Sequence, residues 1–529
     1  MIIPKPVSVN ISDADAFFRL DADRGIQDGG LTHITEDLNA FLDKALGFRL
    51  GTSENGAIVF ALESSLAREL GSEGYEMEIT AGSVTIRAAA PNGIFYGVQT
   101  LKQIIVKHYA LECVEIPSMT VRDKPLYGYR GYMLDVCRHF FPVEHILKTV
   151  DILALHKINI LHLHLTDDQG WRVRIDRYPR LTTVGGRRNQ TMGDGRWHGG
   201  YYTREDIHRI VDYCDRKYIT VIPEIDMPGH ATAAIAAYPH LSCRGDDIEV
   251  AEYFGIKSDI LCAGKESTYR FIYEVLDEVA EMFPGPYVHL GGDEAPKDRW
   301  EECPHCRKML ADNGLDRMER LQGLLINKAV GYLKQKGKQA ICWNESLYSG
   351  TLDESVICQY WQDGKDAGSV RKALKKGRSL IVSKFKPYYL DYPHAMHSLK
   401  AVYSFAPEIG AGDIRGVEAP LWTEYVADPA RAEYMTYPRL GAVAEIGWSA
   451  REHRDYDDFT GRLPAYLKLL DMYHVRYADT RDTDPGPLKS LGQMLDFLKR
   501  ASYLKRENWR HQRESIRANK KIARSREDM

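Results

Sequence analysis

The region from about residue 124 to residue 450 alternates short apolar runs with helical segments, and this rhythm constrains the fold more than any other feature. Runs that are apolar throughout are typical of parallel strands buried on both faces. The expected strands are 132–135, 159–165, 219–226, 287–292, 340–343, 356–358, 380–382 and 417–422. Eight such strands with helices between them predict an α/β fold, the (β/α)8 TIM barrel. The competing fold, a doubly wound open sheet, would need a glycine-rich phosphate turn after an early strand, and none is visible.

Two further regions flank the predicted barrel. The first contains a strand over 57–62, a hairpin over 75–87 and a helix over 91–107, which together predict a small α+β domain. The last contains an amphipathic helix over 463–474 and a basic tail, for which a solvated helix is favoured over a partner-binding patch. A chain of 529 residues is too long for one ordinary domain. We therefore expect an N-terminal domain at 1–123, a (β/α)8 barrel at 124–454 and a C-terminal helical extension at 455–529.

The charge balance limits the partners that this chain is expected to bind. Its net charge is -4 and its charged fraction is 27%, which argues against a general nucleic-acid or membrane partner. No apolar run approaches the length of a membrane span, and the N-terminus lacks the apolar segment of a signal peptide. We therefore expect a cytoplasmic protein, unless a leader has been removed. The oligomeric state stays open.

The chain has nine cysteines, so at least one of them is unpaired within the chain. Cys303 and Cys306 form the one closely spaced pair. A structural zinc site would need two more ligands at matching spacing, and only His305 lies near in the sequence. Cys243 and Cys262 flank a loop and are candidates for a disulfide that nothing in the sequence requires. We therefore expect no metal.

Polar and aromatic residues gather at the predicted C-terminal ends of the strands, where a TIM barrel carries its active site. The central strand ends in His289-Leu290-Gly291-Gly292-Asp293-Glu294, with two adjacent carboxylates. Because neighbouring strand residues point to opposite faces, we expect different roles for Asp293 and Glu294. The alternative is a helix cap. Acids beside tryptophans predict a sugar ligand, whose apolar faces stack on aromatic rings and whose hydroxyls bind carboxylates. A phosphate ligand would call for basic clusters instead.

Four motifs at these strand ends resemble glycoside hydrolase family 20, the β-N-acetylhexosaminidases. They are Arg130–Phe140, His162–Arg172, Asp226–His230 and His289–Glu294. The last matches the H-x-G-G-D-E signature of that family without departure. The similarity runs from about residue 80 to residue 480, and the predicted first domain resembles the α/β domain that usually precedes the barrel in this family.

The resemblance implies a mechanism in which the substrate supplies the nucleophile, an exception among retaining glycosidases. The 2-acetamido oxygen of the sugar would attack its own anomeric carbon and form an oxazolinium ring. Glu294 would be the general acid and afterwards the base that activates water. Asp293 would accept the acetamido N–H and stabilise the ring cation, and Tyr389 would donate to the acetamido oxygen. Such a mechanism needs neither metal nor cofactor.

The resemblance also implies a substrate-binding set. Its members are Arg138, Asp167, His230, Trp343, Trp361, Asp391, Trp422 and Glu424. The arginine and the outer acids would hold the hydroxyls of the terminal sugar, and the three tryptophans would wall the pocket. Asp167 and His230 resemble the pair that sets the protonation of Glu294. The alternatives are a loop aromatic for Tyr389, an ion pair at the barrel bottom for Arg138, and a buried or metal-binding histidine for His230.

The function implied in this way is a retaining exo-β-N-acetylhexosaminidase. Its substrate would be an oligosaccharide or glycoside that ends in β-linked N-acetylglucosamine or N-acetylgalactosamine. A relative that releases a disaccharide, similar to a lacto-N-biosidase, is the alternative within enzymes. A sugar-binding barrel without catalysis is the alternative from another class.

Overall fold

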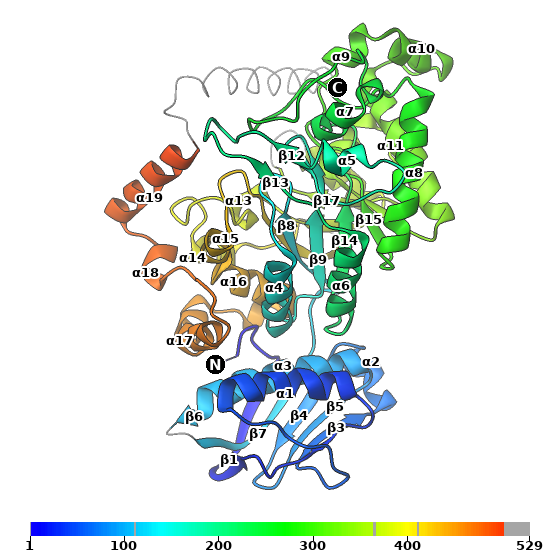
Figure 1. The fold of residues 1–529 in the computed structure, drawn as a ribbon. Coiled ribbons are helices and arrows are strands. Elements are labelled where there is room, and N and C mark those ends of the chain that lie inside the picture. The colour runs from blue at the N-terminus through cyan, green and yellow to red at the C-terminus, as the bar shows by residue number, and fades with distance from the viewer. Residues whose placement is uncertain (1, 111–112, 363–366, 410–411, 502–529) are drawn as a thin grey trace.

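The computed structural model describes residues 2–110, 113–362, 367–409 and 412–501, and its centre is a closed barrel of eight parallel strands (Figure 1). The strands are β8 (Tyr129–Asp135), β9 (Ile160–His164), β14 (Thr220–Glu224), β15 (Tyr287–His289), β16 (Gln339–Trp343), β17 (Ile357–Tyr360), β18 (Leu380–Val382) and β19 (Ile414–Leu421). The barrel closes where β19 pairs with β8. The predicted TIM barrel is therefore confirmed, and each expected apolar run overlaps one of these strands.

Helices surround the barrel, and short elements fill the loops at its C-terminal end. The helices of this region are α4 (Val143–Leu155), α5 (Arg180–Thr183), α6 (Arg204–Asp215), α7 (Thr232–Ala237), α8 (Glu266–Met282), α9 (Asp298–Glu302), α10 (Pro304–Asp312), α11 (Met318–Gln335), α12 (Ala367–Lys375), α13 (Phe385–Tyr388), α14 (Leu399–Ser404), α15 (Pro429–Thr436) and α16 (Arg439–Trp448). The loop after β9 holds two small hairpins, β10 (Thr166–Asp167) with β11 (Gly170–Trp171) and β12 (Arg187–Arg188) with β13 (His198–Gly199). Helix α6 begins with a capping box in which Thr203 and Asp206 satisfy each other's backbone N–H groups.

Side chains in the barrel interior form layers along its axis. The lowest layer is apolar and contains Tyr129, Ile160, Ile222, Ile341, Ile357 and Ile381. Two residues further along several strands lie His162, Glu224, His289, Gln359 and Glu418, all buried. Successive inward positions on a strand are two residues apart, so this polar layer lies between the floor and the mouth of the barrel.

A seven-stranded sheet with two helices on one face precedes the barrel. Its strands are β1 (Ser8–Leu20), β2 (Ile26–Gln27), β3 (Ile58–Leu62), β4 (Tyr75–Ile79), β5 (Val84–Ala88), β6 (Tyr109–Ala110) and β7 (Cys113–Asp123). Its helices are α1 (Thr32–Leu46), the short α2 (Ala67–Leu70) and α3 (Pro91–His108). The predicted hairpin and helix are confirmed as β4–β5 and α3. Strands β1 and β7 were not anticipated, because the polar sequence of β1 lacks a clean alternation.

The helices of this domain face the barrel (Figure 1). Buried polar contacts join the two parts. Lys157, just after α4, forms an ion pair of 2.6 Å with Asp123 at the end of β7. The other oxygen of Asp123 accepts a hydrogen bond of 2.8 Å from the indole of Trp448. Arg130 at the bottom of β8 pairs with Glu73 at 2.7 Å. These contacts fix the small domain against the N-terminal end of the barrel, away from the strand ends.

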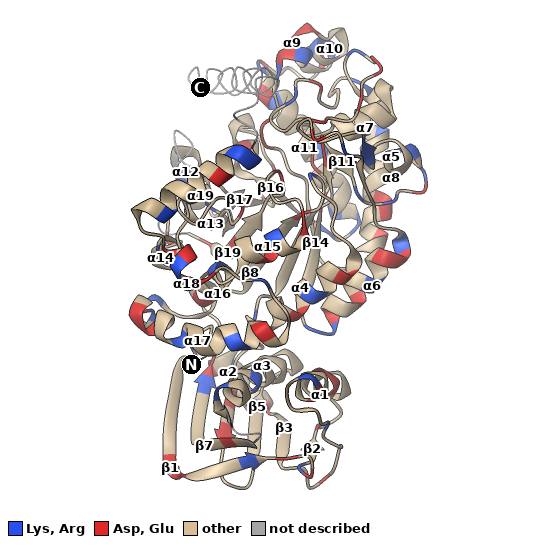
Figure 2. Ribbon diagram, turned by 60° about the vertical axis from the view of Figure 1, so that its left-hand side comes forward, with Lys and Arg blue, Asp and Glu red and all other residues tan. Residues whose placement is uncertain are grey.

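The chain ends in helices, as expected. They are α17 (Tyr456–Met472), α18 (Thr480–Thr483) and α19 (Pro487–Arg500). The basic tail lies mostly beyond residue 501 and so outside the described residues. Figure 2 shows acidic and basic residues interspersed over the helices of both parts. Within the described ranges, no helix has the length and apolar character needed to cross a membrane.

Candidate active site

The loop after β15 carries the two adjacent carboxylates. The strand ends at His289 rather than at Gly292, so the expectation that strand alternation separates Asp293 from Glu294 was wrong. The loop turns instead through positive φ at Gly291 (63°), Gly292 (95°) and Glu294 (42°). A Cβ on Gly291 would lie 1.7 Å from Oδ1 of Asp226, which is why only glycine fits there. The amide of Gly292 donates to the same oxygen at 3.1 Å.

Glu294 is held at the barrel mouth by a residue that the sequence analysis had given no role. The amide of Glu294 donates to Oε2 of Glu345 at 3.2 Å, and Oε1 of Glu345 accepts from Gln362 at 2.8 Å. The side chain of Glu294 remains 28% exposed and therefore accessible from the mouth. Its withdrawal from bulk water, with the nearby carboxylates of Glu345 and Asp293, raises its pKa to about 8 against the opposing effect of His230. Glu294 is thus protonated at neutral pH.

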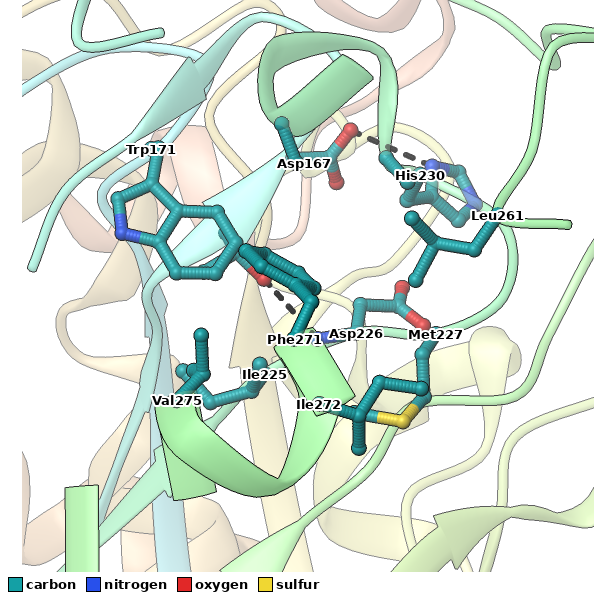
Figure 3. Close-up of a pocket in the computed structure, with 13 residues that line it drawn as sticks. Asp167, Trp171, Ile225, Asp226, Met227, His230, Leu261, Phe271, Ile272 and Val275 are labelled. Carbon is teal, nitrogen blue, oxygen red and sulfur yellow. Dashed lines mark hydrogen bonds and ion pairs between the residues drawn. The ribbon is translucent and has the colours of Figure 1, made fainter. Parts of the chain in front are cut away.

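His230 lies between Asp167 and the two carboxylates, as Figure 3 shows for the first of these contacts. Its Nδ1 is 3.3 Å from Oδ1 of Asp167, and its Nε2 is 3.7 Å from both Asp293 Oδ2 and Glu294 Oε2. Burial alone would lower the pKa of His230, but the carboxylates of Asp167, Asp168 and Asp293 hold it well above the usual value. An imidazolium therefore faces both acids.

An apolar pocket lies behind the Asp167–His230 pair (Figure 3). Trp171 of β11 and Phe271, Ile272 and Val275 of α8 line it. Such a lining keeps water away from the rear of the ion pair, and charges interact more strongly where water is excluded. The charge of the Asp167–His230 pair therefore acts on the carboxylates of Asp293 and Glu294 with little screening by solvent.

Arg138 is buried at the mouth of the barrel, so the alternative of an ion pair at the barrel bottom was wrong. Its guanidinium contacts Asp167 at 2.8 Å, Asp135 at 3.2 Å and Gln169 at 3.1 Å, and lies 4.9 Å from the ring centre of Trp422. Each of its three nitrogens thus has one protein partner. Because each terminal nitrogen carries two N–H groups, one donor on each can still reach a ligand.

Aromatic rings form one wall of the mouth. Trp343, Tyr389 and Trp422 pack in one buried cluster, and Trp361 lies against it. The rings of Trp361 and Tyr389 stack with their centres 6.1 Å apart and an interplanar angle of 20°. The rings of Trp343 and Trp422 are 5.9 Å apart. The predicted tryptophans and tyrosine therefore lie side by side, although their strands are distant in the sequence.

Several acids here have unused hydrogen-bonding capacity. Oδ1 of Asp293 and Oδ1 of Asp391 are buried and have no hydrogen-bond partner among the described residues. Burial, together with Asp226 for Asp293 and with Glu424 for Asp391, raises the pKa of each carboxyl well above its usual value. Burial also raises the pKa of Glu424, which Arg138 opposes. Buried acceptors without partners are costly, so these atoms are expected to be satisfied by a ligand.

The polar layer below is connected to this site. His164 donates from one ring nitrogen to Asp167 and from the other to Glu224, at 2.7 and 2.6 Å. Glu224 also accepts from the indole of Trp343 at 2.8 Å. His162 then bridges Glu224 and Glu418, at 3.1 and 2.9 Å. A continuous chain of charged contacts therefore runs from the barrel interior to His230.

The sequence analysis found the residues that face the mouth but missed most of those that hold them. It gave no role to Asp135, Gln169, Asp226, Glu224 or Glu345. A signal was present, because each of these follows or ends a predicted apolar strand. Their partners, however, come from other strands, and spacing along the chain does not show them.

Comparisons with known proteins agree with this geometry. Residues 127–451 match the model for glycosyl hydrolase family 20, catalytic domain, and residues 1–124 match the model for domain 2 of the same family. A β-hexosaminidase of Porphyromonas gingivalis is 40% identical over 476 residues, covering 86% of this chain and 60% of the relative. The chain thus spans about three fifths of that relative's length.

Solved structures give the same result. The family 20 exo-β-N-acetylglucosaminidase of Vibrio harveyi, in complex with N-acetylglucosamine, has a TM-score of 0.83 and 30% identity, and the match covers 90% of this chain and 78% of that one. The N-acetyl-β-hexosaminidase of Streptomyces plicatus has a TM-score of 0.80 and 32% identity, with 90% and 96% covered. The barrel, the preceding domain and the catalytic-domain match together establish that this chain belongs to glycosyl hydrolase family 20.

Proposed function

We propose that this protein is a retaining exo-β-N-acetylhexosaminidase that acts by substrate-assisted catalysis. The observation that carries the proposal is the arrangement of Asp293 and Glu294. Both carboxylates lie 3.7 Å from the same nitrogen of His230, so they do not oppose each other across a scissile bond. Retaining enzymes with a protein nucleophile place two carboxylates on opposite sides of that bond. The nucleophile is then supplied by the 2-acetamido group of the substrate.

Glu294 acts as the general acid in this proposal. Its carboxyl is accessible and its raised pKa, about 8, keeps the proton available at neutral pH. It gives that proton to the leaving oxygen while the glycosidic bond breaks. As the base in the second half, it takes a proton from the water that opens the oxazolinium ring. His230, held by Asp167, lies close enough to stabilise the carboxylate formed in between.

Asp293 and Tyr389 handle the acetamido group. The free Oδ1 of Asp293 accepts the acetamido N–H, and its carboxylate faces the positive charge that develops on the ring. Burial raises the pKa of Asp293 and disfavours its ionised form in the free site, so that form is favoured far more by the developing cation than by the neutral substrate. Tyr389 donates to the acetamido oxygen and orients it towards the anomeric carbon.

The remaining residues bind the terminal sugar. Arg138, Asp391 and Glu424 supply donors and acceptors for its hydroxyls, and Trp343, Trp361 and Trp422 enclose its apolar faces and methyl group. The substrate class is therefore an oligosaccharide or glycoside with a terminal β-N-acetylhexosamine. We also place the domain boundaries after residues 123 and 454, which the family matches at 1–124 and 127–451 support.

The test compares 4-nitrophenyl N-acetyl-β-glucosaminide with the matching plain β-glucoside, using the wild type, Glu294→Gln and Glu301→Gln. Glu301 is an exposed acid on α9 and serves as the matched control. We expect turnover of the acetamido substrate alone, a fall of about 10²–10⁴-fold in Glu294→Gln, and wild-type rates in the control. In the wild type kcat/KM should fall above about pH 8, as Glu294 loses its proton.

Equal turnover of the plain glucoside would mean that a protein nucleophile exists and that the role of Asp293 is wrong. Release of a disaccharide from an oligosaccharide, with no turnover of the monosaccharide substrate, would favour the disaccharide-releasing alternative. Tight sugar binding without any turnover would favour a binding barrel.

A further inference from the structure

Four cysteines that are far apart in the sequence converge beside the active site. Cys243 and Cys262 lie in the loop between β14 and α8, and Cys303 and Cys306 flank the start of α10. Their sulfur atoms all lie within 4.8 Å of one another. Cys262, Cys303 and Cys306 are buried, and Cys243 is half-buried. The sequence analysis considered only ligands near the C-x-x-C pair and so missed the other two.

Three of the six distances between the sulfur atoms match those of a tetrahedral site, and all six are below 4.8 Å. Sγ of Cys262 lies 3.6 Å from that of Cys306 and 3.8 Å from that of Cys303, and Cys243 lies 3.8 Å from Cys306. Four thiolates bound to zinc at about 2.3 Å sit about 3.8 Å apart. A disulfide would bring two sulfurs to about 2.05 Å, so the disulfide considered for Cys243 and Cys262 does not describe this arrangement.

The backbone around the cluster is shaped to bring the ligands together. A Cβ on Gly264 would lie 2.1 Å from the carbonyl carbon of His305 and 2.3 Å from the amide nitrogen of Cys306. The two ligand loops thus pack backbone against backbone, which a side chain at this position would prevent. The amide of Gly264 also donates to the sulfur of Cys262, and such N–H groups stabilise metal-bound thiolates.

A lysine fixes the loop that carries Cys243. The ammonium of Lys265 lies three residues beyond Cys262 and donates to the carbonyl oxygens of Ser242 and His240, at 2.6 and 3.2 Å. It therefore ties the segment that carries Cys243 to the segment that follows Cys262.

We propose that Cys243, Cys262, Cys303 and Cys306 bind a structural zinc ion. All four positions of the tetrahedron are filled by protein sulfur, so the site has no open coordination position for a substrate or water, as is usual for structural zinc. The ion joins the long loop after β14 to the α9–α10 segment after β15. These two segments follow the strands that deliver His230 and Glu294.

Two hydrogen bonds of Leu261 join the zinc site to the segment before His230 and to α9. Leu261, next to Cys262, donates from its amide to the carbonyl of Pro228 at 3.0 Å and accepts from the indole of Trp300 at 2.9 Å. Pro228 lies two residues before His230. Loss of the ion is therefore expected to free the loop that positions His230, without removing any group that touches the substrate.

Metal analysis of the full-length protein, purified without chelator, tests the proposal. We expect elemental mass spectrometry to find about one zinc ion per chain. The double variant Cys262→Ser/Cys303→Ser should lose this zinc. Cys214→Ser, a change of a buried cysteine on α6, should keep the zinc. Iron in place of zinc, no metal in the wild type, or a protein mass lowered by disulfide formation would each overturn the assignment.

A second measurement covers the case in which the double variant does not fold. Titration of the native wild type with a mercurial that binds thiolates should release zinc stoichiometrically, as seen with a metallochromic indicator. Replacement of zinc by Co²⁺ should give the intense visible absorption of a tetrahedral thiolate site. Release of no zinc, or a cobalt spectrum typical of octahedral oxygen ligands, would contradict the proposal. Both measurements are independent of whether the enzyme acts on N-acetylhexosaminides.

Discussion

The floor of the barrel and the layer directly above it are equally buried but are built in opposite ways. Isoleucines from five strands fill the floor. The layer above contains His162, Glu224, His289 and Glu418, which contact one another through polar atoms at 2.9–3.1 Å. The floor gains its stability from packing, which tolerates similar apolar shapes. The polar layer contributes less to the stability of the fold, because charges are costly to bury even when they are paired.

The difference shows what the polar layer is for. Glu224 orients Trp343, and through His164 it reaches Asp167 and His230. The isoleucines of the floor have no polar side-chain atoms and so make no comparable contact. We therefore expect changes in the floor to alter stability alone, and changes in the polar layer to alter stability and catalysis together.

The largest effect is expected from Glu224→Gln. Glu224 accepts hydrogen bonds from His164 and from the indole of Trp343, and it lies 3.1 Å from His162. The change removes the counter-charge of the buried imidazolium groups of His162 and His164, whose pKa values are raised. The free energy of unfolding should fall by about 3–5 kcal/mol, measured by urea denaturation, and kcat should fall as well. The matched control is Glu78→Gln on the exposed face of β4, which should change neither. A stable and fully active Glu224→Gln would show that the two layers do not differ.

The second prediction concerns the apolar floor, which Ile341→Ala would disrupt. Removal of a buried aliphatic side chain leaves a cavity and should lower the free energy of unfolding by about 2–5 kcal/mol, whereas Ile341→Val should cost about 0.5–1.5 kcal/mol. At a temperature where both variants are folded, their kcat and KM should equal those of the wild type. A large loss of kcat in a folded Ile341→Ala would mean that the floor also positions the site.

The pH dependence of stability sharpens the comparison. Burial alone would lower the pKa of His162, but Glu418 and Glu224 raise it from 6.5 to about 9. A raised pKa in the folded state gives stability that is fully present below pH 6.5 and is lost as the pH rises through about 9, up to about 3 kcal/mol. The free energy of unfolding should therefore decrease between pH 6.5 and 9. The dependence of this free energy on pH should be weaker in Glu418→Gln. An unchanged dependence in that variant would show that His162 is not its source.

The smallest effect is expected at the surface. Lys308 and Asp312 on α10 form an ion pair of 2.6 Å, with side chains 74% and 54% exposed. His164 and Glu224 are separated by the same 2.6 Å in the barrel. Lys308→Ala should change the free energy of unfolding by less than about 0.5 kcal/mol, measured by the same urea denaturation. A change as large as that of Glu224→Gln would mean that distance, rather than burial, sets the strength of these pairs.

Much of the fold was predictable because its signals are local. Apolar runs separated by helices gave all the barrel strands, and the hairpin and helix of the first domain came from turn chemistry and periodicity. The prediction failed where the pattern is not local. Strand β1 has a polar sequence and exists because β7 pairs with it along its length. The end of β15 was placed too late, because Gly291 and Gly292 continue an apolar pattern while their backbone has already turned.

The site residues also fall into those that the sequence predicted and those that it did not. The acids, arginine and tryptophans at the strand ends were found from the sequence, because a parallel barrel brings all its strand ends to one rim. The residues that hold them, such as Glu345 and Gln169, also lie at predicted strand ends but were given no role, since each acts on a partner from another strand.

The sequence by itself determined the barrel, the rim and the chemical character of the groups on it, because strand periodicity and residue type are properties of short segments. Only the tertiary structure decided which of those groups touch. It placed His230 between Asp167 and the carboxylates of Asp293 and Glu294, raised the pKa of Glu294 through its surroundings, and brought Cys243 and Cys262 to Cys303 and Cys306. Contacts of this kind depend on distances across the fold and on the exclusion of water, and neither is encoded in the spacing of residues along the chain.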